Sequence, residues 1–357
     1  MRRHGFEIEV LVLYRRQPGL PTTHPLVEAV CRNGGRATQL ADRWRDLPHT
    51  LLSVAQTLHS EGYALLHTHE YKGDIVGGLA AKLAGVPAVA SVRGYTDRTV
   101  PLRVYKQIDL FALRWFDCVL PVSDHMRDRL LKAGLPSRRV VTVYDAIDPQ
   151  AFGVDSGSDP RRLRNHLGLN TTANVVSIVG RLSPEKGHRF FLQGLGQILE
   201  RFPETQVLIA GDGPERNALR SLVDSLGVDH AVSFLGYRRD VPAIIEASDV
   251  VVLASQREGF GDVLIEAMSL SRPVVATAVG GVPEIVQHDE TGLLVPAGDS
   301  EALAQAVMRL LADPTWSRRL GANGREVVMQ HFHVDVLARR LALVYEELLE
   351  CNTGEMS

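Results

Sequence analysis

The fold of the second half of the chain is decided by one stretch, Val175-Val176-Ser177-Ile178-Val179-Gly180-Arg181-Leu182-Ser183-Pro184-Glu185-Lys186-Gly187. It opens with a short apolar run rich in β-branched residues, which predicts a buried strand. Gly180 ends this strand, Arg181 follows at once, and Lys186 comes just before a helical pattern. A strand that leads through a short loop into a helix indicates a βαβ unit. The two cations therefore lie at the carboxyl end of a strand, where doubly wound sheets bind their ligands.

Short apolar runs and helical patterns alternate on both sides of this stretch. Further strands are predicted at Ile8–Leu13, Arg36–Leu40, Ala64–His67, Ala88–Val92, Cys118–Val122, Val140–Val143, Gln206–Ala210, Val232–Leu235, Val250–Ala254, Val274–Thr277 and Gly292–Val295. Helices are predicted at Asp74–Ala84, Leu102–Leu113, Asp124–Lys132, Arg189–Arg201, Pro214–Leu226, Val241–Ala247, Val263–Leu270, Ser300–Ala312 and, as a long last helix, at about Val334–Glu350. This alternation is typical of α/β proteins with mostly parallel sheets.

The predicted fold is two Rossmann-like doubly wound domains with an interdomain cleft for ligands and a long C-terminal helix. The domain boundary is expected at residues 153–160, which are polar and rich in turn formers. We therefore expect an N-terminal domain over residues 1–152, and a linker and entry to the second domain over 153–172. The C-terminal domain would span residues 173–332, and the C-terminal helix, over 333–357, would pack back on the N-terminal domain.

Composition excludes several classes of protein. A chain of 357 residues with 45% hydrophobic residues is long enough for two cores. Its three cysteines, Cys31, Cys118 and Cys351, lack metal-ligand spacing, and their odd number favours a reducing compartment. Glu7 and Glu9 interrupt the region that a signal peptide needs to be apolar, and no stretch is long and apolar enough to span a membrane. We expect a cytoplasmic protein.

Charge is unevenly distributed between the halves. Residues 1–150 carry 20 Lys and Arg against 15 Asp and Glu, whereas residues 151–357 carry 19 against 27. The basic half could attract an anionic membrane surface or an anionic acceptor, so that peripheral contact with the cytoplasmic face of a membrane is one expectation. Scattered solvated charge is the alternative. The chain has no motif of nucleic-acid-binding domains, and the turn Tyr14–Gly19 lacks the Gly-x-Gly-x-x-Gly pattern of NAD or FAD sites.

Residue types at two strand ends favour binding of a phosphorylated ligand. Arg181 offers a bidentate fork to a phosphate and Lys186 a compact charge, although a surface loop with two solvated cations explains them as well. In the second stretch, residues 254–267, a strand leads through a glycine-rich turn into a helix whose unpaired amides can bind an anion. Glu258 and Glu266, eight residues apart, suit hydroxyl binding at two places on an extended ligand. The alternative makes Glu266 an ordinary helix glutamate.

Glycines also follow two other predicted strands. Gly211 comes after Gln206–Ala210, and Gly236 and Tyr237 come after Val232–Leu235, on the side where a ligand is expected. Turn geometry by itself explains most of this pattern. Gly280-Gly281-Val282-Pro283-Glu284 is a tight turn with a proline near a helix start, which we interpret as mainly structural.

Taken in order, these motifs resemble a known family. They are Gly180-Arg181-x4-Lys186-Gly187, Gly211-Asp212-Gly213-Pro214, Gly236-Tyr237, Glu258-x7-Glu266, Gly280-Gly281-x-Pro283-Glu284 and Thr291-Gly292-Leu293-Leu294-Val295. As an ordered set over residues 175–296 they resemble the retaining glycosyltransferases of family 4, which have the GT-B fold. The N-terminal half matches more loosely, through His67-Thr68-His69, Val122-Ser123 and Val143-x-x-Ala146-Ile147-Asp148-x3-Phe152.

The resemblance implies a hexosyltransferase that uses a nucleotide sugar as co-substrate, with retention, and a carbohydrate or lipid-linked acceptor. Arg181 and Lys186 would hold the donor diphosphate, together with the amides of Val263 and Leu264. Glu258 would contact the transferred sugar. The family needs no metal ion, and an Asp-x-Asp motif is absent from this sequence. The N-terminal domain would then be the acceptor side and the C-terminal domain the nucleotide-sugar side.

The rest of the donor site follows from the same resemblance. The backbone of Phe260 and Gly261 would line the sugar pocket, Glu266 would bind the ribose hydroxyls, and Gly236 and Tyr237 would border the base. The expected catalytic residues are Arg181, Lys186 and Glu258. The expected donor-binding residues are Gly180, Gly211, Gly236, Tyr237, Phe260, Gly261, Val263, Leu264 and Glu266.

The sequence departs from the family pattern on the acceptor side. Arg93, in Ala90-Ser91-Val92-Arg93-Gly94-Tyr95-Thr96, stands where family members usually carry a histidine, and Asp145 stands where an asparagine is common. The glycine-rich acceptor turn after the first strand is also missing, so Arg93 and His69 are the only acceptor-side candidates. Two other functions fit the same architecture: a nucleotide-sugar 2-epimerase, and a non-catalytic relative that binds nucleotide or glycan.

Overall fold

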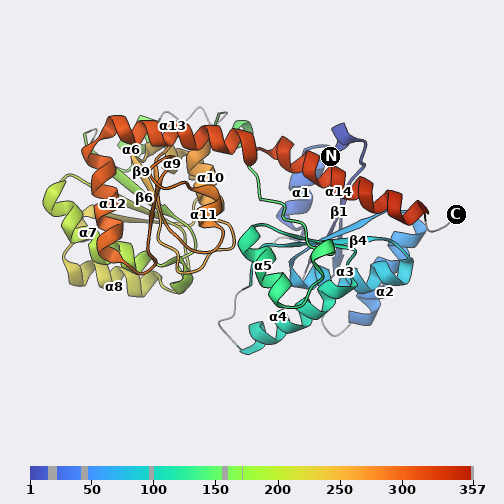
Figure 1. The fold of residues 1–357 in the computed structure, drawn as a ribbon. Coiled ribbons are helices and arrows are strands. Elements are labelled where there is room, and N and C mark those ends of the chain that lie inside the picture. Colours follow the sequence, from blue (N-terminus) through green and yellow to red (C-terminus); the bar gives the residue numbers. More distant parts are fainter. Residues whose placement is uncertain (15–21, 42–46, 96–99, 155–159, 171, 355–357) are drawn as a thin grey trace. The chain divides into compact units, whose positions relative to one another are not determined.

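A computed structural model describes residues 1–14, 22–41, 47–95, 100–154, 160–170 and 172–354. Contacts divide the chain into two compact units: unit 1 comprises residues 1–143 and 337–357, and unit 2 comprises residues 144–336 (Figure 1). Most of the turn Tyr14–Gly19, and part of the predicted linker, lie outside the described residues. No helix within the described ranges is long and apolar enough to cross a membrane.

Unit 2 is built on a six-stranded parallel sheet. Its strands are β6 (Val175–Val179), β7 (Gln206–Ala210), β8 (Val232–Gly236), β9 (Val250–Leu253), β10 (Val274–Thr277) and β11 (Leu293–Val295). Their spatial order is β11-β10-β9-β6-β7-β8, so the chain builds outward from β6 in one direction and then returns to add β9 on its other side. The strand order therefore reverses between β6 and β9, a point where ligands bind in open α/β sheets.

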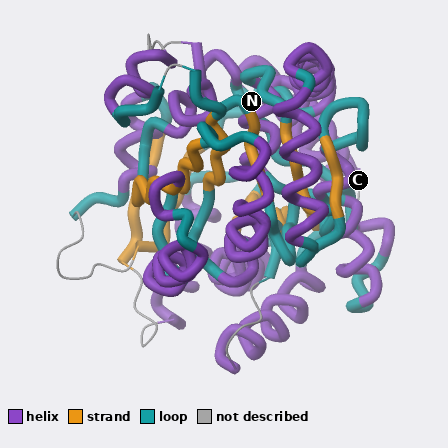
Figure 2. The backbone as a smooth tube through the Cα atoms, turned by 90° about the vertical axis from the view of Figure 1, so that its left-hand side faces the viewer, coloured by secondary structure: helices purple, strands orange, loops and turns teal. Residues whose placement is uncertain are grey.

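Helices cover both faces of this sheet because its strands are apolar on both sides. The helices are α6 (Pro160–His166), α7 (His188–Arg201), α8 (Arg216–Leu226), α9 (Val241–Ala247), α10 (Asp262–Ser269), α11 (Val282–Ile285), α12 (Ser300–Ala312) and α13 (Pro314–His331). Val176 and Ile178 face α7 and α12, whereas Val175 faces α6 and α9. Figure 2 shows the strands in orange with helices in purple around them. Helix α13 was not among the helices predicted from the sequence.

Unit 1 holds two smaller groups of parallel strands. β1 (Glu9–Tyr14) pairs with β2 (Arg36–Ala41), and β3 (Leu66–His69), β4 (Ala88–Val92) and β5 (Cys118–Pro121) form a second sheet in that order. The helices of unit 1 are α1 (Pro25–Arg32), α2 (Leu47–Ser60), α3 (Glu70–Ala84), α4 (Val100–Ala112), α5 (Asp124–Lys132) and most of α14 (Val334–Gly354).

The last helix returns to unit 1 and covers one face of its sheet. On one face of β4, the side chains of Ala88, Ala90 and Val92 pack with α2, α3 and α5. On the other face, Val89 packs with Val344 and Tyr345 of α14. The strand predicted at Val140–Val143 is wrong: Val140 makes one isolated bridge to Val119. The amides of Val141 and Val143 still donate to β5, but Pro121 has no N–H with which to complete a regular ladder.

Gly187 allows the loop after β6 to pack against the end of β9. It has φ +65°, and a Cβ there would lie 2.0 Å from the carbonyl oxygen of Ala254. We expect Gly187→Ala to destabilise unit 2 by about 3 kcal/mol or more, because left-handed strain adds to a backbone clash. The control is Gly227→Ala, with φ +68° and no atom near its Cβ, which should cost about 1 kcal/mol. Thermal unfolding measures both, and equal melting temperatures would contradict this account of Gly187.

Candidate active site

The loops that follow β6 and β9 are joined through their backbones. The amide of Gln256 donates to the carbonyl oxygen of Glu185 over 2.7 Å, and the amide of Arg257 reaches the same oxygen at 3.4 Å. Because β6 and β9 are neighbours in a parallel sheet, both loops leave from the same edge. Two segments about 70 residues apart in the chain thus form one surface at the point where strand order reverses.

Lys186 and Glu258 meet on this surface. The ammonium Nζ of Lys186 lies 2.7 Å from Oε2 of Glu258, and the side chains are 28% and 12% exposed. The hydroxyl of Ser255 donates to the same carboxylate oxygen over 3.1 Å. Glu258 therefore presents a fixed, half-buried carboxylate beside a lysine that keeps part of its surface open to a ligand. The sequence motifs point to both residues as donor-site candidates but do not predict that they pair.

Gly280 packs closely against the backbone of Glu258. A Cβ on Gly280, which has φ +57°, would lie 1.7 Å from the carbonyl oxygen of Glu258. The hydroxyl of Thr277, at the end of β10, donates to the carbonyl oxygen of Ser255 over 2.6 Å. The tight turn that the sequence analysis interpreted as structural is thus what allows the backbone at Glu258 to lie so close to β10.

Arg181 stands at the end of β6, and its side chain is exposed. Among the residues that the structure describes, none forms a hydrogen bond or ion pair with its guanidinium. Its loop is held through the backbone instead, since the amide of Leu182 donates to Asp212 and the amide of Glu215 donates to Leu182, both over 3.0 Å. A fork of five donors is therefore available at the strand end, on a loop that is itself fixed.

Glycines at the carboxyl ends of β6, β7 and β8 join these strand ends through backbone hydrogen bonds. The amide of Gly180 donates to Ala210 over 2.9 Å, and the amide of Gly211 donates to Gly236 over 2.8 Å. Tyr237 follows with 76% of its surface exposed. Gly180, Gly211 and Gly236 thus shape the edge of the site, and the exposed ring of Tyr237 lies beyond the end of β8, the last strand in that direction.

Helix α10 begins at the other side of the surface. Gly261, with φ +116°, is the residue before its first turn, and its position gives no side-chain cap. The amide of Leu264 donates to the Gly261 carbonyl over 2.8 Å, so a ligand oxygen would share this hydrogen. Phe260 is 3% exposed and packs against Tyr144 and Phe332, at ring distances of 5.8 and 5.5 Å. This aromatic cluster fixes the backbone that precedes the helix.

Glu266 is the other acidic side chain that the sequence analysis singled out here. It lies one turn into α10, and burial raises its pKa to about 7, with the nearby charge of Asp262 as a smaller cause. A carboxyl group that titrates near neutrality can either accept or donate a hydrogen bond. Its partial exposure leaves it accessible to a ligand hydroxyl.

His188 is a feature that the sequence analysis missed. It begins α7 directly after Gly187, is 1% exposed, and neither ring nitrogen has a hydrogen-bond partner within the described part of the chain. Burial, and secondarily the charge of Lys186, lower its pKa to about 4. The ring is therefore neutral at physiological pH and adds no charge beneath Lys186. The only signal in the sequence is its position between a strand-end cation and a helix.

The two acceptor-side candidates lie at neighbouring strand ends of unit 1. His69 ends β3 and pairs in register with Ser91, and Arg93, which is exposed, follows the end of β4. His69 stacks on His67 at 4.5 Å. His67 is held by the hydroxyls of Tyr345 (2.5 Å) and Ser91 (2.8 Å), and burial lowers its pKa to about 3. His67 is thus a neutral, fixed support for His69.

Comparison with known proteins covers both units. The family model Glycosyl transferases group 1 matches residues 159–327, and the model Glycosyltransferase Family 4 matches residues 1–151. The chain is 31% identical to alpha-maltose-1-phosphate synthase of Mycolicibacterium smegmatis, over 84% of this chain and 83% of that protein. It is 28% identical to N-acetyl-alpha-D-glucosaminyl L-malate synthase of Bacillus anthracis, over 83% of this chain and 78% of the relative.

Solved structures show the same fold. The structure of HepE from Anabaena in complex with UDP matches with a TM-score of 0.83, at 24% identity, over 96% of this chain and all of that one. Sucrose-phosphate synthase of Thermosynechococcus elongatus matches with a TM-score of 0.81, at 25% identity, over 98% of this chain and 91% of that one. With motifs, fold and full-length relatives in agreement, the chain belongs to glycosyltransferase family 4 and has the GT-B fold.

Proposed function

We propose that this glycosyltransferase transfers a hexosyl group from a nucleoside-diphosphate sugar, with retention of configuration and without a metal ion. The observation that carries the proposal is the Lys186–Glu258 pair, with the exposed guanidinium of Arg181 on the same loop as Lys186. Arg181 and Lys186 bind the diphosphate, assisted by the start of α10. Glu258 accepts hydrogen bonds from hydroxyls of the transferred sugar. Positive charge next to a fixed carboxylate matches a ligand that is anionic at one end and polyhydroxylated at the other.

Catalysis in this proposal is mainly electrostatic. The bond between the anomeric carbon and the diphosphate oxygen breaks, and a bond from the acceptor oxygen forms on the same face of the sugar. The acceptor proton passes to the departing phosphate oxygen. Arg181 and Lys186 stabilise the negative charge that develops on this leaving group, and one such positioned group contributes roughly 3–4 kcal/mol. Protein cations take the role that a divalent metal would otherwise have.

The named relatives guide the choice of substrates. HepE has been solved with UDP, with UDP and glucose, and with UDP-glucose. A relative from Escherichia coli, 28% identical, is a UDP-Gal:alpha-D-GlcNAc-diphosphoundecaprenol alpha-1,3-galactosyltransferase. We therefore propose UDP-hexoses as the first donors to test, and a carbohydrate or lipid-linked glycan as the acceptor.

Arg93 is the acceptor-side residue for which we propose a new role. A guanidinium stays protonated at working pH, so Arg93 cannot act as a general base. It can donate a fork of hydrogen bonds to a carboxylate, a phosphate or vicinal hydroxyls. We therefore assign Arg93 to binding an anionic or polyhydroxylated group of the acceptor, with His69 beside it.

Replacing Arg181 tests the donor site. Arg181→Ala should lower kcat about 10²- to 10³-fold, because the charge that develops on the leaving group loses a preorganised donor. Arg319→Ala removes an equally exposed arginine from α13 of the same unit and should leave kcat unchanged. The measurement is release of nucleoside diphosphate that depends on acceptor, after a thermal-shift screen of nucleotide sugars has identified the donor. A folded Arg181→Ala variant with wild-type turnover would disprove the assignment.

Chelation tests the proposed independence from metal. Because two protein cations neutralise the diphosphate, turnover should stay within about twofold of its starting value in excess EDTA. The measurement compares initial rates before and after dialysis against chelator. A loss of activity that Mn²⁺ or Mg²⁺ restores would mean that the diphosphate is bound through a metal ion instead.

Glu266 gives a test based on pH. Its pKa, about 7 in the folded protein, lies above the value of an unfolded glutamate, so its contribution to stability is lost as pH rises toward 7. In Glu266→Gln the free energy of unfolding should no longer fall over this pH range. In the wild type the fall is roughly 3 kcal/mol once Glu266 is fully ionised. If the carboxylate binds ribose hydroxyls, UDP affinity of the wild type should rise between pH 6 and 8, relative to Glu266→Gln. Parallel pH profiles of the two proteins, in both unfolding and titration calorimetry, would refute both roles.

A further inference from the structure

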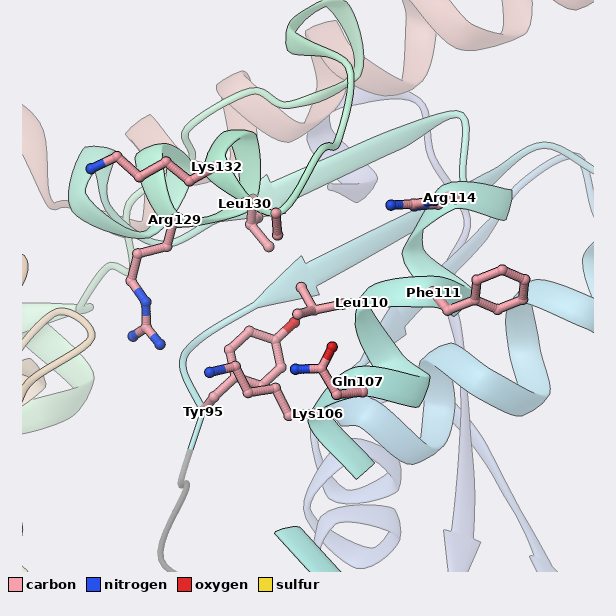
Figure 3. A pocket seen from close by; sticks show the side chains of 10 residues that line it. Tyr95, Lys106, Gln107, Leu110, Phe111, Arg114, Arg129, Leu130 and Lys132 are labelled. Carbon is pink, nitrogen blue, oxygen red and sulfur yellow. The ribbon is translucent and has the colours of Figure 1, made fainter. Parts of the chain in front are cut away.

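A groove of about 590 Å³ lies between α4 and α5 on unit 1. Figure 3 shows its side chains: Tyr95, from the segment after β4, lies beside Lys106 of α4, and Arg129 and Lys132 project from α5. Arg114, which follows the end of α4, also lines the groove. None of these residues belongs to the donor site, and the proposed reaction does not use them.

The groove is strongly positive. Among the lining residues that the structure describes, four are cations, Lys106, Arg114, Arg129 and Lys132, and none is acidic. The ammonium of Lys106 lies 5.7 Å from the centre of the Tyr95 ring. A wall with several cations among its described lining residues is complementary to a phosphate group.

Two buried carboxyl groups lie close to Tyr95. The hydroxyl of Tyr95 donates to Oδ2 of Asp109 over 2.7 Å, and Asp109 is 2% exposed. Burial raises the pKa of Asp109 and of Asp74, which is close to it. These buried acids hold Tyr95 and present no charge at the surface. The exposed carboxylate of Asp128 lies on α5 but does not line the groove.

Apolar side chains are exposed along the same helix. Val104, Ile108 and Phe111 are 52%, 43% and 58% exposed, and they lie at intervals of four and three residues on one face of α4. Phe111 also lines the groove. Helix α4 therefore presents an apolar stripe directly beside a cluster of cations, which is the arrangement of helices that lie at a membrane interface.

We propose that this face of unit 1 docks on a bilayer of anionic phospholipid, with a lipid phosphate in the groove and Phe111 and Ile108 in the interface. The exposed apolar stripe favours a bilayer over a soluble anion, because a soluble phosphate would leave this stripe in water. The donor site contributes nothing to this contact, so vesicle binding can be measured without nucleotide.

The first experiment measures co-sedimentation with vesicles. At low salt the wild type should bind phosphatidylcholine vesicles that contain phosphatidylglycerol, bind pure phosphatidylcholine poorly, and lose binding as salt rises. Each cation near an anionic surface strengthens binding about fivefold. The double variant Arg129→Ala/Lys132→Ala should therefore bind about 25-fold more weakly. The control Arg32→Ala/Lys82→Ala removes two exposed cations, of α1 and α3, that do not line the groove, and should change binding less than threefold.

The second experiment separates a bilayer from a soluble ligand. Phe111→Ser should weaken vesicle binding several-fold, whereas Leu83→Ser, at a side chain of α3 that is 63% exposed, should not. Glycerol phosphate alone should bind weakly. The proposal is overturned if the wild type does not bind anionic vesicles, or if both double variants bind alike. Tight binding of glycerol phosphate with no effect of Phe111→Ser would instead identify a site for a soluble anion.

Discussion

The reversal of strand order between β6 and β9 is the constraint on which the proposed donor site depends. All strands of a parallel sheet have their carboxyl ends at the same edge. Where the strand order reverses, the connections from two adjacent strands run to opposite sides of the sheet, and a crevice is left between the loops that follow these strands. Here the loops from both strands occupy that edge and are joined through the carbonyl of Glu185. The 2.7 Å contact between Lys186 and Glu258 exists only because of this arrangement.

Backbone packing then sets the precision of the site. Gly187 and Gly280 stand where carbonyl oxygens of neighbouring loops leave no room for a side chain. Phe260 is anchored by two aromatic rings of the same unit, so the turn before α10 rests on a packed core. The polar groups that meet a ligand are therefore carried by segments whose own positions are determined by packing, which reduces the ordering that binding requires.

In unit 1, buried side chains hold residues that lie at the surface. Its sheet is covered on one face by the returning α14, and Tyr345 of that helix holds His67, on which His69 stacks. On its other side, a buried carboxyl pair and Tyr95 support a surface rich in cations and exposed apolar groups. The excess of basic residues in the N-terminal half is thus partly concentrated in one groove rather than scattered evenly.

The sequence by itself determined the fold class, most of the strands and helices, and the family, because these depend on local periodicity and on motifs within short stretches. It also singled out Arg181, Lys186 and Glu258 as candidate catalytic residues, an assignment that stays a prediction. It failed where the outcome depended on partners distant in the chain: the extended segment at Val140 that forms no regular strand, and the buried His188. Only the tertiary structure decided that Lys186 pairs with Glu258 and that the cations of α4 and α5 share a groove. Residues about 70 positions apart are brought together by sheet order, and no local pattern encodes that order.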